Sequence, residues 1–244
     1  MAPAGTSPAV AGRGTPPFPP PSPSLPAPAA GASVRDLTFR PLAAANDAEV
    51  AAVVALVNHC YRGGASWTDE SAIVDGRRVT PERLRDYAAT SDVLVVVAPA
   101  PAPAAAATAA AAAHGANGAH DGGGTAAADG APIIGVVKTG WTDETVVGPL
   151  DGRAYYLGLL AVAPTWQSRG VGAALADRVE AAAAAAGASR VVMDVIDARP
   201  ELLAWYARRG YRRTGGGMPA RAFIEAKGER LLVDCRFIVL EKVL

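Results

Sequence analysis

The stretch "TWQSRGVGAAL", from Thr165 to Leu175, decides the fold because its glycines open a predicted helix. The first backbone N–H groups of a helix have no intrahelical partner and lie at the positive end of the helix dipole, so a glycine loop at this place can bind a phosphate. The glycines alone are compatible with three kinds of site: a P-loop, a dinucleotide fingerprint, or a loop that binds some other phosphate.

The neighbouring residues weigh against the first two kinds. A P-loop needs Lys and then Ser or Thr directly after its second glycine, but Gly172 is followed by Ala173. A dinucleotide fingerprint would use Asp194, on the next strand, for a ribose contact. However, "APTWQSR" separates Gly170 from the end of the preceding strand at Val162. The rest of the chain is also too short for the further β-α units of a Rossmann fold.

The whole stretch fits the third kind of site. An apolar strand ends at Val162, Pro164 stops it, and the loop then turns into the helix. The glycines let a phosphate approach the backbone without a Cβ in the way, and Arg169 can add a charged donor. The strand before the loop offers N–H and C=O groups to an extended ligand that carries amides. The pattern therefore predicts a diphosphate site built from backbone.

The composition restricts the classes of function. The formal net charge is +0, so no global electrostatic attraction to nucleic acid or to an anionic membrane is expected. The chain contains no apolar run long enough to span a bilayer. Cys60 and Cys235 lack metal-ligand spacing and are expected to be small apolar residues in a reducing compartment.

Two low-complexity segments divide the chain. Residues 1–34 are rich in Pro and Ala and are expected to be a disordered tail or a transit-like segment, which leaves a cytoplasmic protein or, alternatively, a plastid or mitochondrial one. A second such segment at about 99–131 is expected to be an insert within a hairpin. Its His114 and His120 are expected to be loop residues, and no metal site is predicted. Residues 35–244 form the predicted domain.

The rest of the sequence predicts an α/β fold with a mixed central sheet of about six to seven strands and helices on both faces. A helix is predicted at 46–62 with Asn46 or Asp47 as its N-cap, and another begins at Thr80. Further helices are predicted at 170–186, ended by Gly187, and at 200–210. Strands are predicted at 37–42, 92–99, 132–141, 154–162, 190–196, near Tyr211 and at the C-terminal "CRFIVLEKVL".

This pattern resembles the GNAT N-acetyltransferase superfamily. Its signature is an apolar strand that ends in V-x-P, followed by Q/R-x-x-G-x-G/A, and this chain has "VAPTWQSRGVG" from Val162 to Gly172. The helix "ELLAWYARRGY" and the last strand "FIVLEKVL" are similar to those of the family. The segment "YRGGASWTDESAIVDGRR" looks like a bacterial-type subgroup whose acceptor is unassigned. The resemblance covers about 37–244 without the insert.

The resemblance implies transfer of an acetyl group from acetyl-CoA to an amine by direct attack. The pantetheine would pair with Leu160, Ala161 and Val162, and Tyr206 would be the general acid. The diphosphate would lie on the backbone of the loop and first helical turn, formed by Ser168, Arg169, Gly170, Val171, Gly172 and Ala173, and Gln167 is also a predicted coenzyme-binding residue.

The sequence departs from the family at two positions. Arg199 stands where many members have an Asn, and Tyr156 stands where histone-type members have a Glu base. No general base is therefore assigned: Asp69, Glu70 and Glu201 are candidates, and so is a water relay.

Two further groups of residues could contribute to a site. The basic residues Arg199, Arg208, Arg209, Arg212 and Arg213 could contact coenzyme A or an acidic acceptor, or could form a solvated face. Trp67, Thr68 and Glu70 would line the acceptor side.

The expected function is thus acetyl transfer to a primary amine, with a small metabolite as the favoured acceptor. Two alternatives stay open: a module that binds acyl-CoA without catalysis, and an acetyltransferase for protein N-termini or lysines. We expect no nucleic-acid or membrane partner, and either a monomer or a homodimer.

Overall fold

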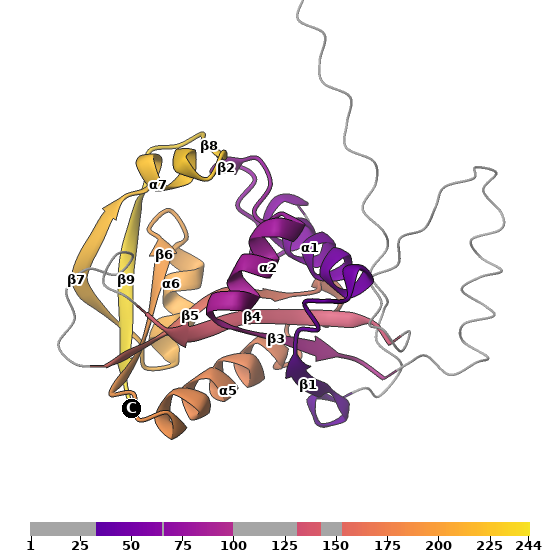
Figure 1. Cartoon of the computed structure of the whole chain (residues 1–244). Helices are drawn as coiled ribbons and strands as arrows, with labels where there is room; N and C mark the ends of the chain where they lie inside the picture. Colours follow the sequence, from indigo (N-terminus) through magenta and orange to yellow (C-terminus); the bar gives the residue numbers. More distant parts are fainter. Residues whose placement is uncertain (1–32, 65, 100–130, 143–152) are drawn as a thin grey trace, which may run out of the picture.

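A seven-stranded sheet in the order β1-β3-β4-β5-β6-β9-β7 organises the chain (Figure 1). The structure is a computed structural model that describes residues 33–64, 66–99, 131–142 and 153–244. All neighbouring strands are antiparallel except β5 and β6, which are parallel. The strands are β1 (Thr38–Pro41), β3 (Asp92–Val97), β4 (Ile133–Trp141), β5 (Ala154–Val162), β6 (Arg190–Ile196), β7 (Arg212–Pro219) and β9 (Arg236–Val243).

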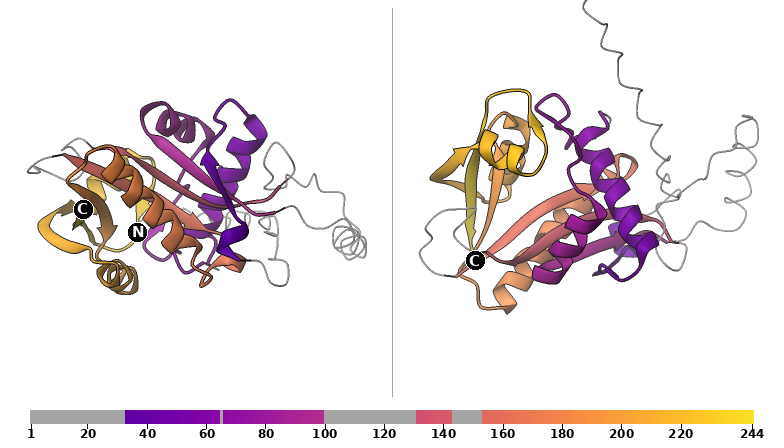
Figure 2. Two further views of the ribbon diagram at one scale, coloured as in Figure 1. Left: turned by 90° about the horizontal axis from the view of Figure 1, so that it is seen from below. Right: turned by 45° about the horizontal axis from the view of Figure 1, so that its top comes forward.

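Helices cover both faces of the sheet, so the predicted mixed α/β architecture is confirmed. Helices α1 (Asp47–Arg62) and α2 (Pro81–Thr90) contact β3, β4 and β5 on one face, while α5 (Val171–Ala185) lies against β4, β5 and β6 on the other (Figures 1 and 2). Helix α6 (Pro200–Arg208) follows β6. The valine-rich central strands and α1 bury their apolar side chains in one core, in which Val53, Leu56 and Leu175 have no exposed surface.

The helix boundaries follow the local signals. Of the two candidate caps of α1, Asn46 is the N-cap, and its side chain accepts a hydrogen bond from the Glu49 N–H. Thr80 caps α2 in the same way, with Pro81 in the first helical turn. Gly187 follows α5 with a φ of 76°, a left-handed conformation that costs glycine little.

A small second sheet was not predicted. Strand β2 (Val74–Asp75) pairs with β8 (Arg230–Leu231), and the short helix α7 (Ala220–Ala226) precedes β8. In Figure 1 these elements connect the α1–α2 side of the molecule to the β7–β9 side. Strands of two residues have no periodicity to read, which is why the sequence did not reveal this link.

Several expectations concern residues outside the described ranges. They concern the N-terminal tail up to residue 32, nearly all of the insert, and the two histidines within it, His114 and His120.

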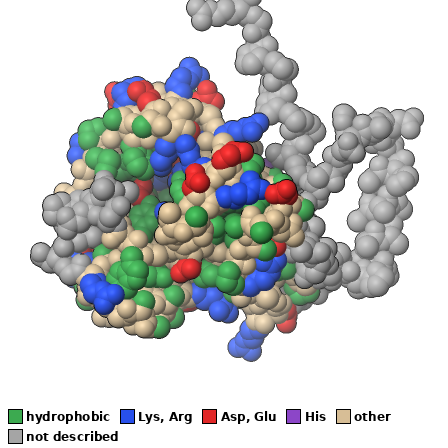
Figure 3. Space-filling view, in the orientation of Figure 1, with side chains coloured by type: hydrophobic (Ala, Val, Ile, Leu, Met, Phe, Trp, Pro, Cys, Tyr) green, Lys and Arg blue, Asp and Glu red, His purple; other side chains and the backbone are tan. Residues whose placement is uncertain are grey.

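The charges on the surface are mixed. On the face seen in Figure 3, basic and acidic side chains are interspersed. No helix in the described ranges has both the length and the apolar character required to cross a membrane.

Candidate active site

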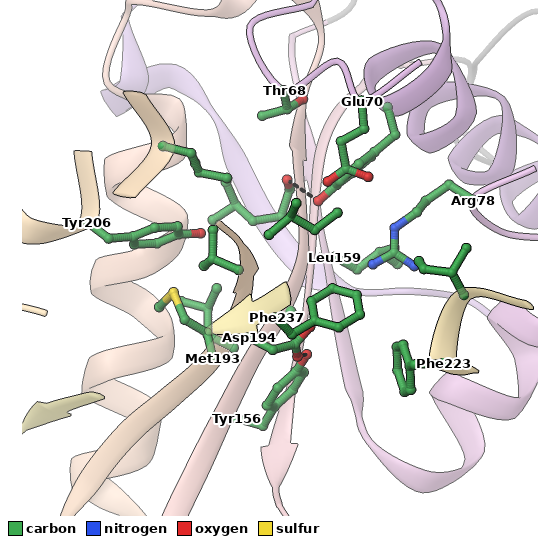
Figure 4. Close-up of a pocket in the computed structure, with 18 of the residues that line it drawn as sticks. Thr68, Glu70, Arg78, Tyr156, Leu159, Met193, Asp194, Tyr206, Phe223 and Phe237 are labelled. Atoms are coloured by element: carbon green, nitrogen blue, oxygen red, sulfur yellow. Dashed lines mark hydrogen bonds between the residues drawn. The ribbon is translucent and has the colours of Figure 1, made fainter. Parts of the chain in front are cut away.

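The two parallel strands in the middle of the sheet separate after three residue pairs. Strand β5 pairs with β6 from Ala154 opposite Arg190 to Tyr156 opposite Val192, and no further pair joins the described parts of these strands. Beyond that point, residues 157–160 of β5 and 193–196 of β6 line one cavity, the central cavity (Figure 4). The backbone edge of β5 that would face a strand partner here is therefore available to a ligand with amide groups.

Strand β5 also carries a β-bulge at this place. Gly158 lies opposite Lys138 and Ala161 lies opposite Val136, so two residues, Leu159 and Leu160, oppose one residue of β4. Leu159 has a φ of 52°, which costs a non-glycine residue roughly 1–2 kcal/mol. A residue keeps such a conformation only where the packing around it enforces it, and residues of this kind cluster at binding and active sites.

The loop before α5 contains the second strained residue. Ser168 has a φ of 58°, and in the described ranges only Leu159 and Ser168 combine a side chain with a positive φ. Gly170 follows with a φ of 86° as the N-cap of α5, whose first turn has no side-chain cap. Left-handed residues beside a helix N-terminus direct successive N–H groups into a concave site for an anion.

A second cavity, of about 360 Å³, lies over this loop, and we call it the loop cavity. Seven of the predicted ligand-binding residues line it: Leu160, Val162, Gln167, Ser168, Gly170, Gly172 and Ala173. A Cβ built on Gly172 would lie 3.8 Å from Val162 Cγ2 and 3.9 Å from Leu160 Cδ2, so it would occupy space between the loop and β5 without a clash.

The three other predicted ligand-binding residues, Ala161, Arg169 and Val171, do not line the loop cavity. The side chains of Ala161 and Val171 are buried in the core, and Arg169 is exposed outside the cavity lining. The Gln167 amide bonds to protein groups: it donates to the Val162 carbonyl at 2.8 Å and accepts from the Trp67 N–H at 3.0 Å. This side chain therefore ties the loop to β5, and its contribution to a phosphate site would come from its backbone.

Tyr206 of α6 is buried, and its hydroxyl points into the central cavity (Figure 4). Its ring packs edge-on against Trp205 and Tyr211, with centroid distances of 4.8 and 5.5 Å. Burial raises the pKa of this phenol, so it keeps its proton at neutral pH.

A second tyrosine at the bulge had no signal in the sequence. Tyr61, in the last turn of α1, donates its hydroxyl hydrogen to the Leu160 carbonyl oxygen at 3.0 Å. Burial raises its pKa, and the neutral hydroxyl holds the bulge against α1.

The three candidate carboxylates lie in different settings. Glu70 lines the central cavity but pairs with Arg62 at 3.0 Å. Glu201 pairs with Arg199 at 2.6 Å, and Asp69 accepts hydrogen bonds from its own loop, including the Gly64 N–H at 2.9 Å. Neither Glu201 nor Asp69 lines one of the described cavities.

Asp194 of β6, first considered as a ribose ligand, lies where the two strands separate. It lines the central cavity, and its carboxylate accepts a hydrogen bond from the Tyr156 hydroxyl (Figure 4). This acceptor raises the pKa of Tyr156 in addition to the larger effect of burial. Asp194 is thus a carboxylate at the centre of the site that the residue pattern did not mark as a base.

The basic residues do not form one cluster. The buried Arg199 guanidinium donates to the carbonyl oxygens of Trp67 at 2.7 Å and Thr68 at 3.2 Å, and so holds the loop after α1. Arg209 pairs with Asp177 and Glu180 on α5. Only Arg208 lines the loop cavity, and Arg212 and Arg213 are exposed on β7.

Trp67, Thr68 and Glu70 were expected together on the acceptor side, but they are divided between the loop cavity and the central cavity. Trp67 lies in the loop cavity, with its ring edge-on to Trp205 at 6.2 Å. Thr68 lines both the loop cavity and the central cavity, whereas Glu70 lines only the central one. Trp67 therefore faces the glycine loop before α5 rather than the opposite end of the site.

A third cavity, of about 320 Å³, continues from the central one toward α2, and we call it the cationic cavity. Its charged lining residues are Arg78, Lys138, Lys227 and Asp194. It shares Tyr156, Leu159, Asp194 and other residues with the central cavity, so the three cavities form a continuous series through the separated strands.

The small second sheet connects the two sides of the site beside these cavities. Arg62 strengthens the link because its guanidinium pairs with Glu70 and with Glu229, next to β8, and donates to the Gly76 carbonyl at 3.0 Å. Arg83 of α2 donates to the Lys227 carbonyl at 3.1 Å. The segments 64–80 and 220–231 are thus joined across the site.

The cysteines are separate free thiols, and only Cys60 is buried as expected. Cys60 is buried, donates to the Val162 carbonyl at 3.3 Å and has its pKa raised to about 12 by burial. Cys235 is partly buried. Within the described ranges, no group of three or more His, Cys, Asp or Glu residues is arranged to hold a metal ion.

Comparison with known proteins identifies similar chains. The family model described as "Acetyltransferase (GNAT) family" matches residues 96–211. The fold is similar to that of Arabidopsis thaliana NAA60 in complex with a bisubstrate analogue, with a TM-score of 0.52 and 12% identity over 85% of this chain and 99% of the other. No curated protein sequence matches this chain significantly.

Two further solved structures have the same fold. The NatC complex bound to Gag peptide and CoA has a TM-score of 0.51 and 12% identity, over 86% of this chain and 99% of the other. The protein smu.2055 from Streptococcus mutans UA159 has a TM-score of 0.51 and 13% identity, over 84% and 98%.

Proposed function

The chain belongs to the GNAT acetyltransferase superfamily, and on that premise we propose that it transfers an acetyl group from acetyl-CoA to the primary amine of a small metabolite. The observation that carries this proposal is the separation of β5 from β6 next to a bulge and a helix N-terminus. Acetyl-CoA supplies the activated thioester, and the residues of this chain bind it and orient the acceptor.

The loop cavity suits the diphosphate and pantetheine of acetyl-CoA. The left-handed backbone of Ser168 and Gly170, beside the N-terminus of α5, would direct N–H groups toward the phosphates, and the missing Cβ of Gly172 leaves room for them. The free edge of β5 suits the amides of pantetheine, since an extended ligand can add to an unpaired strand edge.

The central cavity suits the reacting groups. A backbone N–H in the bulge, at Leu160, would polarise the thioester carbonyl, and Tyr61 holds this residue by its carbonyl. Tyr206 would hydrogen-bond to the departing sulfur and supply its proton, since its hydroxyl points into the cavity in neutral form. Asp194 would orient the acceptor ammonium and take up its proton.

The link between segments 64–80 and 220–231 favours a small acceptor. A peptide substrate needs an open groove, whereas here the β2–β8 pairing and the Arg62–Glu229 ion pair cross the site. The cationic cavity, of about 320 Å³, is at the lower end of the range for small-molecule sites.

A thiol-release assay with acetyl-CoA and a panel of amines tests the function. We expect turnover with at least one small primary amine, and lower kcat/KM with peptides. Turnover of peptides above that of all small amines would support acetylation of protein N-termini or lysines instead. Tight acetyl-CoA binding without turnover of any amine would support a binding module without catalysis.

The variant Gly172→Ala tests the phosphate site. The added methyl group should weaken acetyl-CoA binding about tenfold or more by displacing the diphosphate from the N–H groups, as measured by calorimetry. The fold should not suffer, because alanine in a helix is about 0.5–1 kcal/mol more favourable than glycine. Ala181→Ser, on the exposed face of the same helix, is the control. Unchanged affinity in Gly172→Ala would exclude this loop as the diphosphate site.

The variant Tyr206→Phe tests the general acid. Loss of the hydroxyl should lower kcat about 10²-fold, with little change in acetyl-CoA affinity. The matched control is Tyr211→Phe, since this neighbouring buried hydroxyl bonds to Glu180 at 3.1 Å outside the cavities. If kcat falls equally in both variants, the effect of Tyr206→Phe comes from packing and not from acid catalysis.

The variant Asp194→Asn tests the base. It keeps the size of the side chain and a partner for Tyr156, but it should lower kcat about 10²-fold because an amide cannot accept the ammonium proton. Asp197→Asn, an exposed neighbour outside the cavities, should retain wild-type kcat. Full activity of Asp194→Asn at all pH values would assign the proton transfer to another group or to water.

A further inference from the structure

The cationic cavity has an unbalanced charge. Three of its four charged lining residues are cations, Arg78, Lys138 and Lys227, and Asp194 is the only carboxylate among the described lining residues. Asp194 also accepts a hydrogen bond from the neutral Tyr156 hydroxyl, which leaves its negative charge in place. Because three cationic side chains and one carboxylate line this cavity, it has an excess of positive charge and favours a ligand with a negative charge.

Arg78 is the first of these cations. Its side chain is partly buried between α1 and the cavity, with the guanidinium carbon 5.2 Å from the centre of the Tyr61 ring. Within the described residues, its guanidinium has no hydrogen bond and no carboxylate within ion-pair distance; only its backbone N–H is bonded, to Asn58. A partly buried guanidinium that lines a cavity and has no hydrogen-bonded partner among the described residues can bind an oxyanion in a bidentate manner.

Lys227 presents a second cation to the same space. Its ammonium lies 3.5 Å from the centre of the Phe223 ring and makes no ion pair within the described residues. Burial, and then the charge of Arg78, lower its pKa to about 7, while Asp194 and Glu229 oppose this effect and Arg83 adds to it. The two cations thus repel each other in the free protein, and an anion beside them would relieve that repulsion.

We propose that the acceptor is an amino-acid-like amine whose oxyanion group, a carboxylate or phosphonate, binds to Arg78 and Lys227 in the cationic cavity. This inference rests on the proposed function and specifies its substrate class. Asp194 lies where the cationic and central cavities meet, so an acceptor with its oxyanion on Arg78 would place its ammonium toward Asp194 and the bulge. Opposite charges at the two ends of the acceptor match opposite charges in the site.

The first test compares matched acceptors in the intact protein. Amino acids and aminoalkylphosphonates are compared with the corresponding carboxamides, which keep the amine but lack the charge. We expect kcat/KM to be at least about tenfold higher for the anionic member of a pair, and the better of the two anions identifies the oxyanion. Equal values, or a preference for the carboxamides, would overturn the inference and leave acetyl transfer intact.

The second test changes the cation. Arg78→Gln should raise KM for the anionic acceptor about 10- to 100-fold and change KM for the carboxamide less than about threefold. Arg77→Gln, an exposed neighbour that lines no described cavity, is the matched control. Arg78→Lys should restore part of the affinity. An equal rise of KM for both acceptors would mean that Arg78 only shapes the site.

The third test measures binding without turnover and so does not depend on catalysis. The N-acetylated product keeps the oxyanion but has no amine to titrate. Its binding should be tightest below pH 7, where Lys227 is protonated, and should weaken up to about tenfold per pH unit as Lys227 loses its proton above pH 7. Lys227→Met should remove this dependence. A flat profile for the wild type, or absence of any binding, would contradict the inference even if no amine were turned over.

Discussion

The separation of β5 from β6 after Tyr156 and Val192 is the constraint on which the rest of the structure depends. A strand edge inside a sheet normally pairs with its neighbour, because an unpaired N–H or C=O group away from water is costly. Here the separation instead opens the middle of the sheet to a ligand. Every described cavity borders one or both of these strands.

The separation would be unstable without support from elements on each side. Tyr61 holds the bulge by the Leu160 carbonyl, Tyr156 joins β5 to Asp194 of β6, and Gln167 fixes the end of β5 to the following loop. The backbone strain is concentrated in the same place, at Leu159 and Ser168. One strained residue lies at the proposed thioester position and the other at the proposed phosphate position, which is consistent with strain retained for binding.

The second sheet holds in place residues of the cavity that is proposed to bind the acceptor. The link between β2 and β8, with Arg62 between Glu70 and Glu229, positions Phe223 and Lys227 against the cavity that also contains Arg78. These residues come from segments 64–80 and 220–231, which lie outside the strand-loop-helix motif around Gly170. The phosphate-binding part and the acceptor part of the proposed site are therefore built from different parts of the chain.

The sequence by itself determined helices α1, α2, α5 and α6, the main strands and the glycine loop before α5, because caps, periodicity and glycines act over a few neighbouring residues. Asn46, Thr80 and Gly187 marked helix ends correctly, and seven of the loop and strand residues chosen for the ligand line one cavity. The roles proposed for Asp194 and Arg78, and the contact of Tyr61 with the bulge, could be inferred only from the tertiary structure. Their partners lie far away along the chain, as in the Tyr61–Leu160 and Tyr156–Asp194 hydrogen bonds, and no local pattern encodes which distant side chains will share a cavity.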